Sequence, residues 1–225
     1  MITYYLYVVL PALLLAGIAQ LWLKSTFAKY SQVPIQTGIS GREAAQRILM
    51  AAGLTDVEIK PVPGMLSDHY NPMTRTVCLS EDIMNGRTPA AVGVAAHECG
   101  HALQHAQGYK PMEARSAMVP VVNLSSSLAF PMILAGIFIA SLHWLAWVGV
   151  IAFALAVLFH IVTLPVEFDA SHRAIKIVEQ SGMATAADMK GVRTTLYAAG
   201  FTYVAATAGA ILQLLYFIAI VNGRD

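Results

Sequence analysis

Four long stretches without a charged residue alternate with polar segments along this chain. They cover residues 2–23, 117–142, 144–164 and 195–221. A helix that spans a membrane needs about 20 apolar residues, and each stretch meets that length. The alternative is a set of buried core helices, but the polar segments are too short to enclose four of them. The pattern therefore predicts a mainly α-helical membrane protein with four transmembrane helices.

The composition agrees with this interpretation. Hydrophobic residues make up 57% of the 225 residues and charged residues 12%, whereas soluble domains carry about 25% charged residues. The net charge of +1 gives no general attraction to nucleic acid, so we expect contact with membrane lipid and none with nucleic acid. The two cysteines, Cys78 and Cys99, are too few for a disulfide framework and suit a reducing compartment.

The distribution of basic residues predicts an orientation in the membrane. We expect the first apolar stretch to remain as a helix and not to be cleaved as a signal peptide, because no Lys or Arg precedes it. Four spans then place residues 24–116 and 165–194 on one side. That side holds every Lys and Arg except Arg224, so the positive-inside bias predicts that it is cytoplasmic.

The polar segment after the first span predicts a small α+β domain. Ser40 and Glu43 have the spacing of a capping box, which predicts a short helix that ends at Gly53. Residues 57–60 alternate between apolar and polar side chains, so they predict a strand, and Pro61 should stop it.

A turn-rich stretch at residues 64–74 leads to a second alternating segment at 75–80. A well-marked helix follows. Thr88 is the expected N-cap, Pro89 occupies the first helical position, and Gly108 follows the last turn.

His97, Glu98 and His101 form an H-E-x-x-H motif in the middle of this helix. At about 100° per residue the two histidines share one face about 6 Å apart, so both imidazoles can bind one zinc ion. Glu98 points roughly 80° to the side, where it can reach a water on the metal without becoming a ligand. Cys99 points about 180° away and should pack into the core. Two solvated surface histidines are the non-functional alternative, but the position between clear helix caps favours a metal site.

A catalytic zinc site needs a third protein ligand. His105 lies about 12 Å along the helix from His97 and cannot share that ion, so we interpret it as structural or solvent-facing. Glu167, Asp169 and His172 follow the third span on the same side of the membrane, and spacing alone does not choose among them. A polar helix end at the membrane interface would explain the same residues without a metal.

The chain resembles the neutral zinc metallopeptidases of bacterial membranes, often called YugP-like. The similarity covers most of the chain, and its most specific stretches are Ser67-Asp68-His69-Tyr70-Asn71-Pro72, Leu79-Ser80-Glu81-Asp82, residues 92–102, Gln104-His105-Ala106 and Leu164-Pro165-Val166-Glu167-Phe168-Asp169-Ala170-Ser171. This family is distantly similar to HtpX-type membrane proteases, in which a Glu on a later helix completes the zinc site. The resemblance implies Glu167 as that ligand. The HtpX-type pattern has an acidic residue where Ser171 stands, and this difference leaves the role of Asp169 open.

The resemblance also implies a zincin-like, gluzincin-type α+β catalytic domain at the membrane surface and one zinc ion per chain. It implies a multi-pass protein of the bacterial cytoplasmic (inner) membrane, with the catalytic domain facing the cytoplasm. The expected organisation is a transmembrane helix at 1–23, the catalytic domain at 24–116, a transmembrane hairpin at 117–164, a helix with the third ligand at 165–194, and a last transmembrane helix with the C-terminal tail at 195–225.

These features predict a zinc metallopeptidase that hydrolyses peptide bonds of membrane or membrane-proximal proteins. Zinc activates water, and Glu98 acts as the general base. His69, Tyr70 and His172 are candidates for the donor to the oxyanion. The alternative function is a catalytically silent, zinc-stabilised scaffold or adaptor, against which the unligated Glu98 argues. The sequence leaves open the substrate, the role of Asp169, and whether homo-oligomers or complexes with other membrane proteins form.

Overall fold

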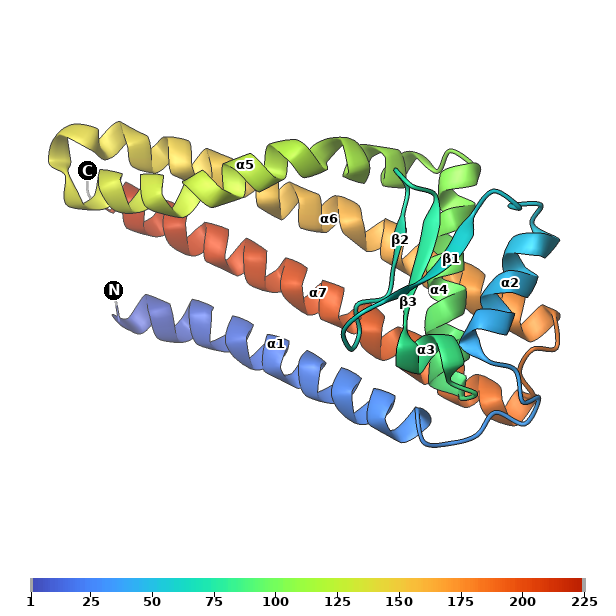
Figure 1. The fold of residues 1–225 in the computed structure, drawn as a ribbon. Helices are drawn as coiled ribbons and strands as arrows, with labels where there is room; N and C mark the ends of the chain where they lie inside the picture. The colour runs from blue at the N-terminus through green and yellow to red at the C-terminus, as the bar shows by residue number, and fades with distance from the viewer. Residues whose placement is uncertain (1, 224–225) are drawn as a thin grey trace. The chain divides into compact units, whose positions relative to one another are not determined.

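Four long helices dominate the computed structural model, which describes residues 2–223 and the side chains of residues 6–223. They are α1 (Ile2–Tyr30), α5 (Lys110–Phe138), α6 (His143–Gln180) and α7 (Ala186–Asn222) (Figure 1). All four are long and apolar enough to cross a membrane, which confirms the prediction of four candidate spans.

The helices extend beyond the apolar stretches in most places. The second stretch is the exception, because α5 ends at Phe138 and a 3-10 turn, η1 (Ala140–Leu142), follows it. The polar helix expected after the third span is not a separate element. It is the continuation of α6 through Pro165, so residues 165–194 comprise the end of α6, a short turn and the start of α7.

The described chain divides into two compact units. The helical unit contains residues 2–20, 113–165 and 202–223, and the sheet unit contains residues 21–112 and 166–201. In the helical unit, α5 and α6 form a hairpin whose helices approach closely at two glycines. A Cβ at Gly136 would overlap the backbone nitrogen of Ala146, and a Cβ at Gly149 would lie 2.7 Å from the carbonyl oxygen of Ala129. Small residues therefore set the packing of this hairpin, as is usual for helices in membranes.

The sheet unit contains three strands in the order β1-β3-β2. β1 (Glu58–Val62) is parallel to β3 (Thr76–Ser80), and β2 (His69–Asn71) is antiparallel to β3. Two expectations are corrected. The strand at 57–60 does not stop at Pro61, because β1 is an edge strand and an edge tolerates a residue without an N–H. The turn-rich stretch contains β2, whose three residues are too few to show alternation.

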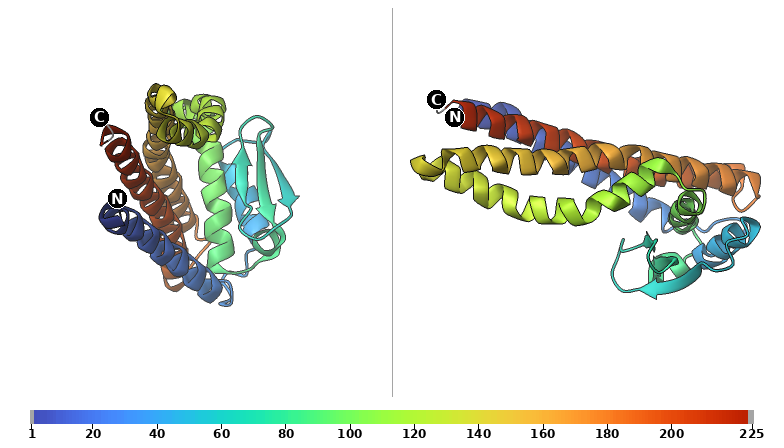
Figure 2. Two further views of the ribbon diagram at one scale, coloured as in Figure 1. Left: turned by 90° about the vertical axis from the view of Figure 1, so that its left-hand side faces the viewer. Right: turned by 90° about the horizontal axis from the view of Figure 1, so that it is seen from above.

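Three helices complete the sheet unit: α2 (Gly41–Ala51), α3 (Glu81–Asn85) and α4 (Pro89–Ala106). The predicted capping box of α2 is confirmed, since Ser40 Oγ accepts from the Glu43 N–H and Glu43 Oε2 accepts from the Ser40 N–H. α4 lies between the sheet and the segments of α6 and α7 that belong to this unit (Figure 2). It is therefore buried on both sides and can carry side chains toward either layer.

Candidate metal centre

The α4 helix presents the two motif histidines on one face. Its start is fixed as predicted, with the Thr88 side chain accepting from the Ala91 N–H and Pro89 in the first turn. His97 and His101 lie one turn apart, with ring centroids 4.7 Å apart and planes at 81°. The two rings therefore meet edge to face, and each directs one nitrogen toward the same region.

The α6 helix supplies Glu167 to this region because α4 and α6 come into backbone contact. A Cβ at Gly100 would lie 2.7 Å from the carbonyl oxygen of Ala170 and 3.1 Å from its Cα. Only glycine permits this separation. Gly100 is one of the two variable positions of the motif, and a glycine in the interior of a helix is a signal from which the close approach could have been predicted.

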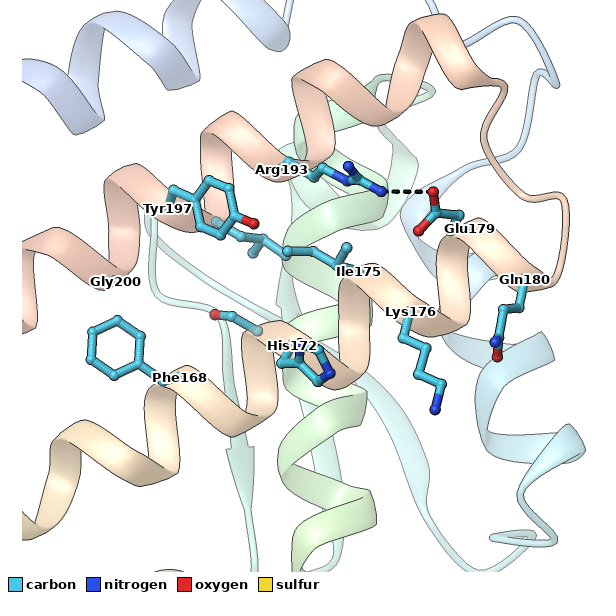
Figure 3. Close-up of a pocket in the computed structure, with 11 residues that line it drawn as sticks. Phe168, His172, Ile175, Lys176, Glu179, Gln180, Arg193, Tyr197 and Gly200 are labelled. Atoms are coloured by element: carbon cyan, nitrogen blue, oxygen red, sulfur yellow. Dashed lines mark hydrogen bonds and ion pairs between the residues drawn. The ribbon is translucent and has the colours of Figure 1, made fainter.

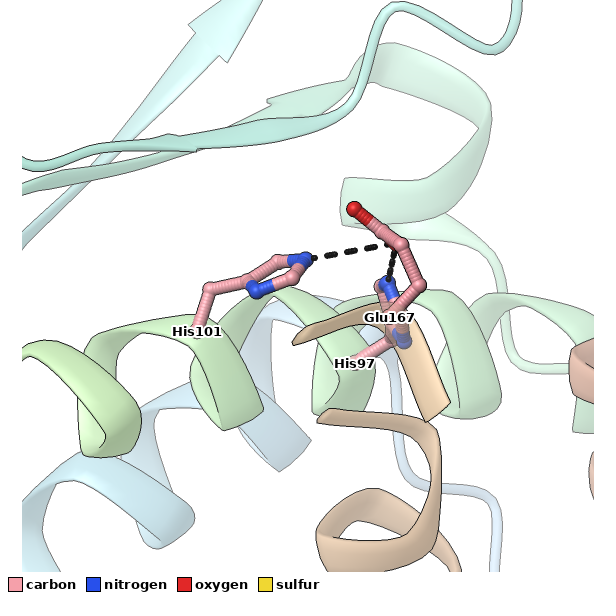
Figure 4. A group of neighbouring side chains, drawn as sticks. All are labelled: His97, His101 and Glu167. Atoms are coloured by element: carbon pink, nitrogen blue, oxygen red, sulfur yellow. Dashed lines mark hydrogen bonds and ion pairs between the residues drawn. The ribbon is translucent and has the colours of Figure 1, made fainter. Parts of the chain in front are cut away.

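The three side chains converge on one point (Figure 4). Glu167 Oε2 lies 3.3 Å from His97 Nε2 and 3.7 Å from His101 Nε2, and one ligand atom from each residue lies within 4.8 Å of the others. Bonds of about 2.0–2.2 Å in a tetrahedral zinc site place neighbouring ligand atoms about 3.3–3.6 Å apart. The two distances from Glu167 Oε2 are close to this range, so two imidazoles and a carboxylate arranged in this way could hold a zinc ion.

Burial concentrates charge at this point. The Glu167 side chain is only 3% exposed. Burial lowers the pKa of His101, but the carboxylates of Glu167 and Glu98 beside it outweigh burial, so the pKa of His101 is raised overall. The acidic surroundings therefore favour a positive charge at His101, and a divalent cation bound beside it would supply that charge.

Ser171 reaches the second nitrogen of His97. Its Oγ lies 3.1 Å from His97 Nδ1, one turn of α6 beyond Glu167. Ligating histidines usually bond their other ring nitrogen to a nearby polar group, which orients the ring. Ser171 thus places a neutral hydroxyl oxygen beside the second ring nitrogen of His97.

Cys99 and His105, two other residues of this helix, lie as predicted. Glu98 is buried but does not belong to the group of three converging ligands. Cys99 is fully buried in the core of the sheet unit, and burial raises the pKa of its thiol, which keeps it protonated. His105 lies away from the group, with its Nδ1 2.8 Å from the Tyr70 hydroxyl.

The remaining candidates have other partners. Asp169 Oδ2 accepts from Arg173 and from Gln104 and is not part of the converging group. His69 Nδ1 bonds to the carbonyl of Ser67. His172 lines a hollow of about 750 Å³ between α6 and α7, together with apolar side chains such as Ile175 (Figure 3).

Comparison with known proteins places this chain in a family. Residues 5–222 match the family described as "Putative neutral zinc metallopeptidase". The chain belongs to this family. A curated protein of Bacillus subtilis (strain 168), "Putative membrane protease YugP", is 44% identical over 222 residues, which cover 98% of this chain and 98% of the relative. No solved structure matches the chain.

Membership in the neutral zinc metallopeptidases confirms the resemblance inferred from the motif stretches, and it implies zinc as the metal. The sequence analysis did not identify Gly100 and Gln104 as parts of the site, and it named Ser171 only as a difference from the HtpX-type pattern. Gly100 and Gln104 lie on α4 and Ser171 lies on α6, and each contacts one of the two histidines or the neighbouring helix. Their types carry no metal chemistry of their own, so spacing alone could not identify them.

Proposed function

We propose that the protein is a membrane-embedded zinc peptidase in which His97, His101 and Glu167 hold one zinc ion per chain. The observation that carries this proposal is that one ligand atom from each of the three residues lies within 4.8 Å of the others. The two histidines belong to the H-E-x-x-H motif of α4. Three protein ligands leave one position open, as catalytic zinc sites require. The sheet unit would then be a zincin-like catalytic domain.

Glu98 is the proposed general base. Zinc, when bound, would activate water and polarise the scissile carbonyl. Glu98 takes the proton of the attacking water and later transfers it to the leaving amine. Its burial beside His101 keeps bulk water from competing for that proton. His69, Tyr70 and His172 are the proposed candidates for the hydrogen-bond donor to the oxyanion.

Membrane-proximal or misfolded membrane proteins are the proposed substrates. Glu167 follows the apolar stretch that ends at Leu164 after three residues, which favours peptide bonds close to the membrane surface. β2 is an edge strand of the sheet, and an edge can accept an extended peptide through its backbone groups. The hollow beside His172 adds an apolar surface, and Ser171 forms part of its wall.

A zinc-stabilised scaffold is the weaker alternative. Structural zinc sites usually have four protein ligands, whereas the converging group of described residues has three. A scaffold also has no use for a buried carboxylate at Glu98.

The proposed location is the bacterial cytoplasmic membrane, with the sheet unit facing the cytoplasm. The support is the asymmetry of basic residues across the four candidate spans. Lipid is the proposed surrounding partner, and self-association or contact with other membrane proteins stays open.

Metal analysis of the purified protein tests the zinc site. We expect about one zinc per chain, because the group offers one set of ligands. His97→Ala and His101→Ala should both lose it. Full retention of zinc in both variants would refute the site.

A further inference from the structure

A fully buried amide lies beside the second nitrogen of His101. Gln104 is 0% exposed and lies three residues after His101 on α4. Its Oε1 is 2.9 Å from His101 Nδ1. A buried amide must satisfy both its donors and its acceptor, because an unpaired polar group costs free energy in the interior.

The partners of the amide nitrogen fix which way Gln104 faces. Gln104 Nε2 donates to the carbonyl oxygen of Val166 at 2.8 Å and to Oδ2 of Asp169 at 2.8 Å. A backbone carbonyl can only accept. Asp169 Oδ2 also accepts from Arg173 Nε at 2.5 Å, so it has no proton to offer. The NH₂ group must therefore face α6, and the amide oxygen must face His101.

This orientation determines the tautomer of His101. Because an amide oxygen only accepts, His101 Nδ1 must carry the proton that it shares with Gln104. A neutral imidazole with its proton on Nδ1 has its lone pair on Nε2. Nε2 is the atom that lies 3.7 Å from Glu167 Oε2, so the lone pair points into the proposed metal position.

We propose that Gln104 is a positioning residue that holds the His101 ring in its metal-binding tautomer and orientation, and that Asp169 and Arg173 hold Gln104 in turn. This inference rests on the proposed function, since it assigns these residues to the zinc site. It gives Asp169 a role as a support of the site and not as a ligand.

The chain of bonds also joins the two helices that supply the ligands. Gln104 belongs to α4, and its partners Val166 and Asp169 flank the ligand Glu167 on α6. Arg173 extends the contact, since its Nη1 donates to Oε1 of Gln107, just after the end of α4, at 2.5 Å. Gln104 therefore fixes His101 relative to the backbone that carries Glu167.

Two substitutions at Gln104 separate a positioning role from simple packing. Gln104→Met keeps the size of the side chain but removes the acceptor for His101. Gln104→Glu keeps an acceptor oxygen, and in its protonated form the other oxygen can donate to Val166 or Asp169. Gln46→Met is the matched control, because it makes the same change at an exposed position of α2, outside this chain of bonds.

Zinc dissociation constants should be measured by chelator competition on the full-length protein in detergent, together with the absorption spectrum of the Co²⁺-substituted protein. We expect Gln104→Met to bind zinc about 10–100-fold more weakly, which is the usual effect of losing an outer partner. Gln104→Glu should bind zinc nearly as well as the wild type and show a similar Co²⁺ spectrum. Asp169→Ala should have a smaller effect than Gln104→Met, because Val166 still orients the amide.

Packing alone predicts the opposite order, since an apolar side chain suits a buried site and an acidic one does not. Wild-type affinity in Gln104→Met, or a greater loss in Gln104→Glu than in Gln104→Met, would overturn the inference. Absence of zinc from both the wild type and Gln46→Met would overturn the proposed function and the inference with it.

Discussion

Glu167 Oε2 lies 3.3 Å from Nε2 of His97, although 70 positions separate the two residues in the chain. The contact joins the helix that carries the motif to the helix that continues from the third apolar stretch. Sequence reasoning reached Glu167 through family resemblance, because spacing left Asp169 and His172 equally eligible. The structure separates the three by their surroundings, since Glu167 converges with the two histidines.

Removal of the Glu167 carboxylate should weaken the site more than the loss of any outer partner. We expect Glu167→Ala to raise the zinc dissociation constant by more than the roughly 10–100-fold typical of outer partners. Glu179→Ala is the control on the same helix, because Glu179 pairs with Arg193 away from the site. Equal zinc affinity in the two variants would show that Glu167 is not a ligand.

Zinc binding should depend on the close contact between the helices at Gly100 as well as on the ligands. A Cβ there would overlap the carbonyl oxygen of Ala170, so Gly100→Ala should push α6 from α4 and weaken zinc binding. Gly93→Ala is the matched control, since the nearest atom to its Cβ belongs to Val192 at 3.4 Å. Both changes improve helix propensity by about 0.5–1 kcal/mol, so the difference in zinc dissociation constants measures the contact alone. Equal constants would contradict this role of Gly100.

Two substitutions of Ser171 test whether this residue orients His97 for zinc binding. Ser171→Ala removes the partner of His97 Nδ1 and should weaken zinc binding by about 10-fold. Ser171→Asp supplies a stronger acceptor for the Nδ1 proton, so it should bind zinc at least as tightly as the wild type. Chelator competition measures both, and tighter binding in Ser171→Ala than in Ser171→Asp would argue against an orienting role.

Much of the architecture was predictable because its signals are local. Charge-free stretches predicted the four long helices, and the caps at Ser40 and Thr88 marked the starts of α2 and α4. The errors also have local causes. Pro61 can lie inside β1 because that strand is at an edge of the sheet, and β2 is too short to produce a pattern.

The outer part of the site was not predictable in the same way. Gln104 has its role only because α6 places Val166 and Asp169 against it. A glutamine on a helix carries no signal of such a partner. Tertiary contacts between residues more than 60 positions apart decide these roles, and a single sequence does not record them.

The proposed orientation predicts which surfaces an impermeant thiol reagent can reach in intact bacterial cells. In a Cys78→Ser background, Ser141→Cys in the exposed turn between α5 and α6 should be labelled without lysis. Arg42→Cys, which is exposed on α2, should be labelled only after lysis. The reverse pattern would place the sheet unit outside the cytoplasm.

Turnover by Glu98→Gln tests the central claim most directly. The rate at which purified, zinc-loaded protein cleaves a membrane-protein substrate should be compared between the wild type and Glu98→Gln, at equal measured zinc content. The account predicts cleavage by the wild type and a rate roughly 10²–10⁴-fold lower in Glu98→Gln, because an amide cannot accept the proton of the attacking water. Equal rates in the two zinc-loaded proteins would contradict the proposed peptidase mechanism.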